Sequence, residues 1–233
     1  YLKIPLSIYS MRKYILFSLL TLFLLFMSCE SQEEQQLGFV SEESIDTAVD
    51  YSFVDSSTYN VEGVEIVQSN YWIKNPTTGN WLEASVYQPT DTSLQYPGVL
   101  LVPGGDGGME HFLRPYEGPG GNKELSIAQK FASEGFSVLI FSADGRGNSE
   151  GTKNSNGYKD QDALYEMYTF LLDYETVNTD KIGVVSYSYG ITMASGMLGR
   201  YQPHMLYFIE WEGPFNKYGT GEGEYPASQG VER

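Results

Sequence analysis

The sequence predicts an α/β protein in which a mostly parallel sheet is flanked by helices and preceded by an antiparallel hairpin. Between residues 99 and 211, continuous apolar runs alternate with segments of helical periodicity, which is typical of a parallel sheet with helical crossovers. Between residues 60 and 90, shorter β-rich runs surround a turn and favour antiparallel pairing. The 233 residues have 41% hydrophobic content, enough for one domain with a sizeable core.

The hairpin is expected from three short β-rich runs at residues 61–67, 70–74 and 81–87. Residues 75–80 read Asn-Pro-Thr-Thr-Gly-Asn, and Pro, Gly and Asn are the common residues of turns. The runs on either side of this turn are therefore expected to pair antiparallel.

The parallel part of the sheet is expected to start at residues 99–102, a continuous apolar run typical of a strand buried on both faces. A glycine-rich loop at 103–108 follows, and then Leu125, Ala128 and Ala132 recur at helical spacing before a C-cap at Gly135. The remaining elements are expected as a strand at 136–141, a helix at 160–172, a strand at 181–186, a helix at about 189–200 and a strand at 205–211.

Charge and residue counts exclude several kinds of function. The chain has 30 acidic and 14 basic residues, of which three basic ones are the only charges in residues 1–29, so residues 30–233 hold 30 acidic against 11 basic groups. A body that acidic repels phosphate backbones, so nucleic-acid binding is not expected. One cysteine excludes an internal disulfide and a cysteine zinc site, and two histidines leave few ways to bind a metal. Only carboxylate sites for a hard cation such as calcium stay open, so no metal site or cofactor is predicted.

Residues 1–29 are expected to be an export signal with some upstream residues. Met11-Arg12-Lys13 is a basic start, and the 14 uncharged residues from 14 to 27 are too few for a comfortable membrane span. The run ends at Ser28-Cys29 and resembles a bacterial lipoprotein signal, which implies a lipid anchor on Cys29 at the cell envelope. The alternative is a lone cysteine after an ordinary signal. Residues 30–58 are expected to be an acidic polar tether, and residues 59–233 to be the α/β domain.

A candidate nucleophile lies in the run Ser186-Tyr187-Ser188-Tyr189-Gly190, where a predicted strand becomes a predicted helix. A serine on such a tight turn, with small residues two positions to either side, projects its hydroxyl at the carboxyl edge of the sheet. The run resembles the Gly-x-Ser-x-Gly elbow of the α/β-hydrolase superfamily, with Ser186 in place of the first glycine. Dienelactone hydrolases, prolyl-peptidase-like enzymes and X-Pro dipeptidyl-peptidase-like enzymes belong to this superfamily.

The resemblance covers residues 99–211 and implies roles for several backbone groups. It identifies Ser188 as the nucleophile, the Tyr189 N–H as the first oxyanion donor, and the N–H of Gly105 or Asp106 as the second. Residues 145–151 resemble the loop that follows the next strand in many such hydrolases, with Asp144 in the position of its usual arginine.

The same resemblance implies an acid and a histidine that follow the serine in the chain. His111 lies upstream and is interpreted as a pocket-rim or solvated residue, while His204 precedes the strand at 205–211 and so falls at the opposite edge of the sheet from Ser188. Glu210 or Glu212, at the end of that strand, is a weak candidate for the acid. The remaining residues are turn-rich, so we expect a fragment that lacks its last strands and the catalytic histidine.

Three functions follow from these residues. The first is an exported, lipid-anchored serine hydrolase of an ester, amide or peptide bond that needs no cofactor, inactive as this fragment. The second is a hydrolase-fold surface lipoprotein that binds a ligand in its cleft without catalysis. The third is an acidic domain that binds calcium or a cationic glycan.

Overall fold

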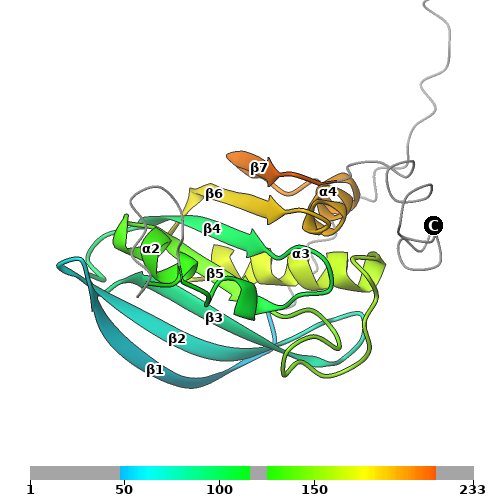
Figure 1. Cartoon of the computed structure of the whole chain (residues 1–233), viewed down its shortest axis with the longest axis horizontal. Coiled ribbons are helices and arrows are strands. Elements are labelled where there is room, and N and C mark those ends of the chain that lie inside the picture. The colour runs from blue at the N-terminus through cyan, green and yellow to red at the C-terminus, as the bar shows by residue number, and fades with distance from the viewer. Residues whose placement is uncertain (1–47, 116–124, 214–233) are drawn as a thin grey trace, which may run out of the picture. The chain divides into compact units, whose positions relative to one another are not determined.

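The computed structural model describes residues 48–115 and 125–213, which form one seven-stranded sheet with helices on both of its faces (Figure 1). The strands are β1 (Tyr51–Val61), β2 (Val64–Lys74), β3 (Trp81–Pro89), β4 (Tyr96–Val102), β5 (Ser137–Phe141), β6 (Val177–Tyr187) and β7 (Tyr207–Trp211). The helices are α2 (Ile127–Ser133), α3 (Tyr158–Leu172) and α4 (Gly190–Tyr201), together with the short 3-10 turn η1 (Met109–His111).

The strand order is β1-β2-β3-β5-β4-β6-β7. From β1 to β5 neighbouring strands are antiparallel, and from β5 to β7 they are parallel. The predicted α/β fold class is therefore confirmed, and its antiparallel part is larger than the single hairpin expected.

Strand β1 extends the sheet into the segment predicted as a tether. It starts at Tyr51, although the tether was expected to continue to residue 58, and it pairs with β2 from Tyr51 opposite Ile73 to Val61 opposite Val64. Glu62 and Gly63 connect the two strands with φ of 53° and 90°, as a tight two-residue hairpin turn requires. Because β1 is an edge strand with mostly exposed side chains, it lacks the apolar alternation by which strands are recognised.

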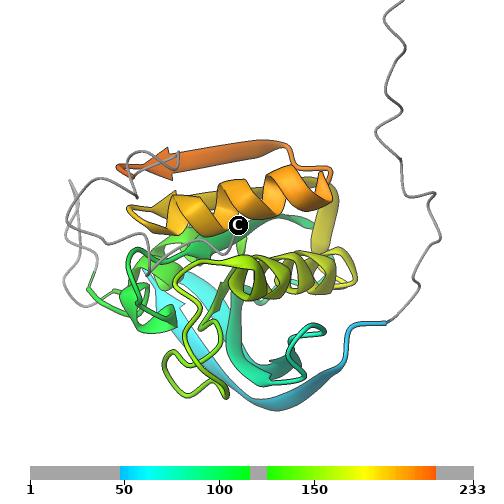
Figure 2. The same ribbon diagram turned by 90° about the vertical axis from the view of Figure 1, so that its right-hand side faces the viewer.

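Helix α2 covers one face of the sheet, and α3 and α4 lie side by side on the other (Figure 2). Alternate residues of β4 point to opposite faces, so Leu100 packs with α3 and α4 whereas Leu101 packs with α2. Each fully buried side chain of this kind stabilises the fold by about 1.5–3 kcal/mol. Ser126 caps α2, since its hydroxyl accepts from the Gln129 N–H while the Gln129 side chain accepts from the Ser126 N–H.

The two strands that follow β4 in the chain lie on either side of it in the sheet. From β4 it crosses through α2 to β5 on one side, and from β5 it crosses through α3 to β6, which lies on the other side of β4. The connections after the neighbouring strands β4 and β6 therefore lead to helices on opposite faces of the sheet, which is the arrangement at which open α/β sheets bind ligands. The loop after β4 and the turn after β6 lie against each other at this point, since a Cβ on Gly104 would be 2.9 Å from the Tyr187 carbonyl oxygen. Within the described residues, none of the helices has the length and apolar character needed to cross a bilayer.

Candidate active site

Ser188 occupies a strained turn at the carboxyl end of β6. Its φ is +51°, a left-handed value that non-glycine residues rarely adopt and that marks a sharp strand-to-helix turn. The Ser188 N–H donates to the Trp211 carbonyl of β7 at 2.8 Å, and the Ser188 carbonyl accepts from the Ile191 N–H at 3.2 Å. The turn is thus fixed by the neighbouring strand on one side and by α4 on the other.

Small residues around Ser188 allow the backbone to pass this closely. A Cβ at Gly190 would lie 2.4 Å from the Pro103 carbonyl oxygen, so a larger residue there would force α4 away from the loop after β4. Ser186 stands where the elbow pattern usually has its first glycine, and it is fully buried. Among the described residues its hydroxyl has no hydrogen-bond partner.

The glycine-rich loop after β4 lies against Ser188. Val102 pairs with Ser186 across β4 and β6, and a Cβ on Gly104 would be 2.9 Å from the Ser188 Cβ. Gly105 has φ of +59°, and the Gly107 N–H donates to the Gly104 carbonyl at 3.2 Å, which closes the loop into a turn. The half-exposed Asp106 carboxylate lies 3.8 Å from the Lys153 ammonium. The structure therefore brings together Ser188, Tyr189, Gly105 and Asp106, the predicted nucleophile and oxyanion residues.

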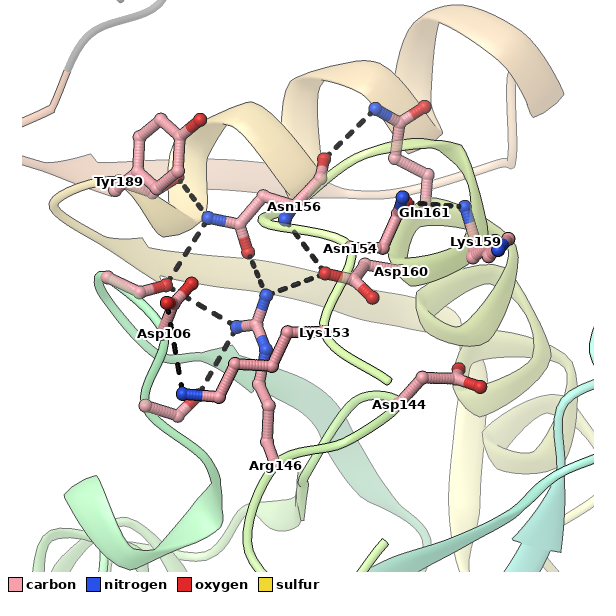
Figure 3. A network of polar contacts seen from close by, with 12 residues as sticks. Asp106, Asp144, Arg146, Lys153, Asn154, Asn156, Lys159, Asp160, Gln161 and Tyr189 are labelled. Carbon is pink, nitrogen blue, oxygen red and sulfur yellow. Dashed lines mark hydrogen bonds and ion pairs between the residues drawn. The ribbon is translucent and has the colours of Figure 1, made fainter. Parts of the chain in front are cut away.

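A buried polar cluster lies directly beneath this loop (Figure 3). The Arg146 guanidinium forms an ion pair with Asp160 at 2.6 Å, and both side chains are fully buried. Arg146 also donates to the carbonyls of Gly105 at 3.4 Å and Gly107 at 3.3 Å. The Asn156 side-chain amide donates to the Tyr189 carbonyl at 3.0 Å and to the Gly105 carbonyl at 3.4 Å.

The cluster is electrostatically compensated. Burial raises the pKa of the Asp160 carboxyl, and the Arg146 charge and the Asn156 N–H oppose that rise by stabilising the carboxylate. The Asn156 N–H donates to Asp160 Oδ2 at 2.8 Å, so the same oxygen accepts from both partners. A bare guanidinium would be costly at this depth, so the ion pair is the arrangement that permits burial of Arg146.

A pocket of about 490 Å³ lies beside the elbow. It is lined by His111, Phe112, Arg114, Pro115, Ile127 and Tyr187, the last of which precedes Ser188 in the chain. His111 is thus at a pocket, as its place after the glycine-rich loop suggested. The pKa of His111 is lowered, first by desolvation and then by the Arg114 charge, against a smaller opposing effect of Glu110. Its ring is therefore held mainly in the neutral form near neutral pH.

The other candidate partners of Ser188 are placed less favourably. His204 precedes β7, which runs parallel to β6, so it lies at the opposite sheet edge from Ser188. Glu210 is exposed on β7 opposite Ser186. Glu212 is exposed as well and has φ of +52°. Both of its neighbours lie against the Ser188 backbone: the Trp211 carbonyl accepts from the Ser188 N–H, and a Cβ on Gly213 would overlap the Ser188 carbonyl. None of the hydrogen bonds of the described residues joins Ser188 to His111 or His204.

Sequence reasoning missed Arg146, Asn156 and Asp160. The loop at 145–151 was aligned with Asp144 at the arginine position, whereas the structure buries Arg146 against the glycine-rich loop. Asp144 is buried elsewhere and accepts hydrogen bonds from Asn75, Thr78 and Asn80 in the β2–β3 turn. The only sign in the sequence is that the chain has few basic residues and that Arg146 and Asp160 are two residues of opposite charge. Neither fact indicates that these side chains are buried.

Among residues 48–115 and 125–213 no group of three or more His, Cys, Asp or Glu side chains could hold a metal ion. Cys29, the predicted lipidation site, lies outside the described residues.

Comparison with known families and structures places the chain among hydrolases. Residues 78–223 match the family model described as X-Pro dipeptidyl-peptidase (S15 family). A comparison with curated protein sequences gives no significant match.

Solved structures with the same fold include two bacterial hydrolase-type proteins. A candidate acetyl xylan esterase from Bacteroides fragilis is 15% identical with a TM-score of 0.51, over 68% of this chain and 47% of that one. A CocE/NonD family hydrolase from Staphylococcus aureus is 14% identical with a TM-score of 0.50, over 72% of this chain and 31% of that one. The chain thus spans less than half the length of these two proteins, and the likeness supports the α/β-hydrolase fold.

Proposed function

The chain belongs to the X-Pro dipeptidyl-peptidase (S15) family, and on that basis we propose that Ser188 is the nucleophile of a serine hydrolase that cleaves a carboxylic ester, amide or peptide bond. One observation carries the proposal. Ser188 adopts φ of +51° between β6 and α4, directly against the glycine-rich loop that follows β4. A strained serine at the switch point of a hydrolase-type sheet is the arrangement that nucleophilic catalysis needs.

The proposed reaction uses backbone groups to stabilise the developing charge. Ser188 Oγ attacks the substrate carbonyl carbon and passes its proton to a base, and the carbonyl oxygen becomes an oxyanion. The Tyr189 N–H and the N–H of Asp106 or Gly105 would donate to that oxyanion. The leaving group departs with the proton returned by the base, and water then hydrolyses the acyl-serine by the same steps.

We propose that the base is a histidine outside these 233 residues. Support comes from the position of His204 at the far edge of the sheet and from the lack, within the described residues, of a hydrogen bond between His111 and Ser188. Of the two carboxylates considered as acid, Glu212 is the better placed, since the residues on either side of it contact the Ser188 backbone.

Labelling of the full-length gene product with a fluorophosphonate tests the proposal. We expect the reagent to modify Ser188 and the Ser188→Ala variant to be unlabelled. Ser186→Ala is the matched control, because Ser186 lies two residues before Ser188, near the end of β6, and its hydroxyl is buried. It should label as the unaltered protein does. A folded full-length protein that is not labelled, or is labelled elsewhere, would contradict the proposal.

Labelling also decides the main rival, a protein that binds a ligand near the pocket at His111 without catalysis. The unpartnered Ser186 hydroxyl in the elbow is the observation that favours this rival. If the protein labels, initial rates on p-nitrophenyl acetate and on an Xaa-Pro p-nitroanilide distinguish an esterase from a dipeptidyl-peptidase.

We further propose that the protein is held at the cell envelope by a lipid on Cys29. The basic start, the apolar run and the Ser28-Cys29 pair support it. Metabolic labelling with a fatty acid should mark the unaltered protein and fail to mark Cys29→Ala. Equal release of both proteins from membranes by salt alone would contradict the anchor.

A further inference from the structure

The Asn156 side chain connects the two halves of the candidate active site (Figure 3). Its amide nitrogen donates to the Tyr189 carbonyl at 3.0 Å, after the nucleophile, and to the Gly105 carbonyl at 3.4 Å, in the glycine-rich loop. We propose that Asn156 is a positioning residue that sets the separation of the two oxyanion donors. This inference rests on the proposed serine hydrolase function.

The orientation of the Asn156 carboxamide is fixed by its partners. Its Oδ1 accepts from Arg146 Nη2 at 2.9 Å, and a guanidinium has donors only, so the oxygen must face Arg146. The amino end is then directed at the two carbonyls and can donate one hydrogen to each. An isosteric carboxylate would keep the contact with Arg146 but would present an oxygen, which cannot donate, to both carbonyls.

The Asn156 backbone is fixed as firmly as its side chain. Its N–H donates to Asp160 Oδ2 at 2.8 Å, and Asp160 in the first turn of α3 forms the buried ion pair with Arg146. Asn156 has φ of +64° and follows Ser155 at +50°, so the loop makes a left-handed turn that asparagine tolerates better than most residues. The residue is fully buried, so no water competes for its donors.

Anchoring the Gly105 carbonyl also selects the second oxyanion donor. A trans peptide is planar, so its N–H points away from its carbonyl. The carbonyl of Gly105 faces Asn156 and Arg146, and the N–H of Asp106 in the same peptide therefore faces away from the cluster. The N–H that this anchoring orients is therefore that of Asp106, and not that of Gly105, which belongs to the preceding peptide. The contacts to Gly105 are long, but Arg146 also holds Gly107, at 3.3 Å, so three contacts act together on this short loop.

The test compares Asn156→Asp with Asn154→Asp in the full-length gene product. Asn154 lies in the same loop, but its side-chain oxygen accepts from the Lys159 N–H at 3.0 Å, a contact that an aspartate retains. We expect Asn156→Asp to slow fluorophosphonate labelling of Ser188 by about 100-fold, the usual effect of losing one oxyanion donor. With a chromogenic substrate, kcat should fall while KM changes little. Asn154→Asp should match the unaltered protein in both assays.

Amide hydrogen exchange provides a readout that does not depend on catalysis. In Asn156→Asp the segments 104–108 and 187–191 should both exchange faster, because each has lost an anchor, while α2 is unaffected. Should Asn156→Asp not fold, Asn156→Gly removes the amide without a charge or backbone strain and must give the same pattern.

Each outcome decides between the two proposals. Unchanged labelling in a folded Asn156→Asp protein overturns the positioning role and leaves the serine hydrolase standing. If the unaltered protein is not labelled, the proposed hydrolase fails, and unchanged exchange at both segments would then overturn the connection through Asn156 as well.

Discussion

Replacement of Gly190 by alanine should push the proposed nucleophile Ser188 away from the glycine-rich loop. The new Cβ would lie 2.4 Å from the Pro103 carbonyl oxygen, whereas ordinary contacts begin near 3.4 Å, so the start of α4 must move by about 1 Å. Overpacking of this kind costs about 1–3 kcal/mol of unfolding free energy. A displacement of about 1 Å at a reacting group lowers the rate by about 100-fold.

Gly199 provides a matched control in the same helix. A Cβ there meets nothing within 4 Å, so Gly199→Ala should stabilise α4 by at most about 1 kcal/mol, through helix propensity alone. The two variants make the same chemical change and should shift the urea midpoint in opposite directions. Fluorophosphonate labelling should be slow in Gly190→Ala and normal in Gly199→Ala. A Gly190→Ala protein with unaltered stability and labelling rate would refute the reasoning.

Three further predictions concern stability. Arg146→Met should lower the free energy of unfolding by about 3–5 kcal/mol, because it leaves the Asp160 carboxylate buried without its ion-pair partner. In urea denaturation the double variant Arg146→Met/Asp160→Leu should recover much of that loss, and equal losses in both proteins would contradict the ion-pair argument. The His111 pKa is lowered in the folded protein, so the stability that the neutral ring contributes is present above the ordinary pKa of 6.5 and is lost as the pH falls below it. His111→Gln should therefore reduce the dependence of the melting temperature on pH between pH 7.5 and 5, and an unchanged dependence would contradict this role of His111. Leu164→Ala should lower the free energy of unfolding by about 2–5 kcal/mol because the Leu164 side chain is fully buried, whereas Leu206→Ala should change it little because Leu206 is 62% exposed. Similar losses of thermal stability in both variants would contradict this difference in burial.

The parallel strands could be predicted because each buried strand is a short continuous run of apolar residues in the sequence. Strands β4 and β5 are apolar on both faces, and such runs have few interpretations besides a buried strand. Ser188 could be singled out because the elbow needs small residues at fixed positions within a few residues of the serine. These signals are local, so a single sequence contains them.

The rest of the site depends on contacts between residues distant in sequence. Asn156 is 51 residues from Gly105 and 33 from Tyr189, and nothing near it in the sequence distinguishes it from a polar residue in a turn before a helix. Arg146 is the same case, since an arginine among glycines is ordinarily solvated. Strand β1 was missed for a different reason, because an exposed edge strand needs no apolar face to pair with β2.

The hydrogen bond between the Ser188 N–H and the Trp211 carbonyl couples the proposed nucleophile to a strand whose side chains are mostly exposed. Most of β7 is exposed, with Trp211 at 64% and Ile209 at 51%, so its end should fray by local unfolding more readily than the buried strands. Fraying would break this hydrogen bond and remove the contact that holds the Ser188 turn from the side of β7. A polypeptide segment that covers this edge should therefore speed fluorophosphonate labelling of the proposed nucleophile without contacting the substrate.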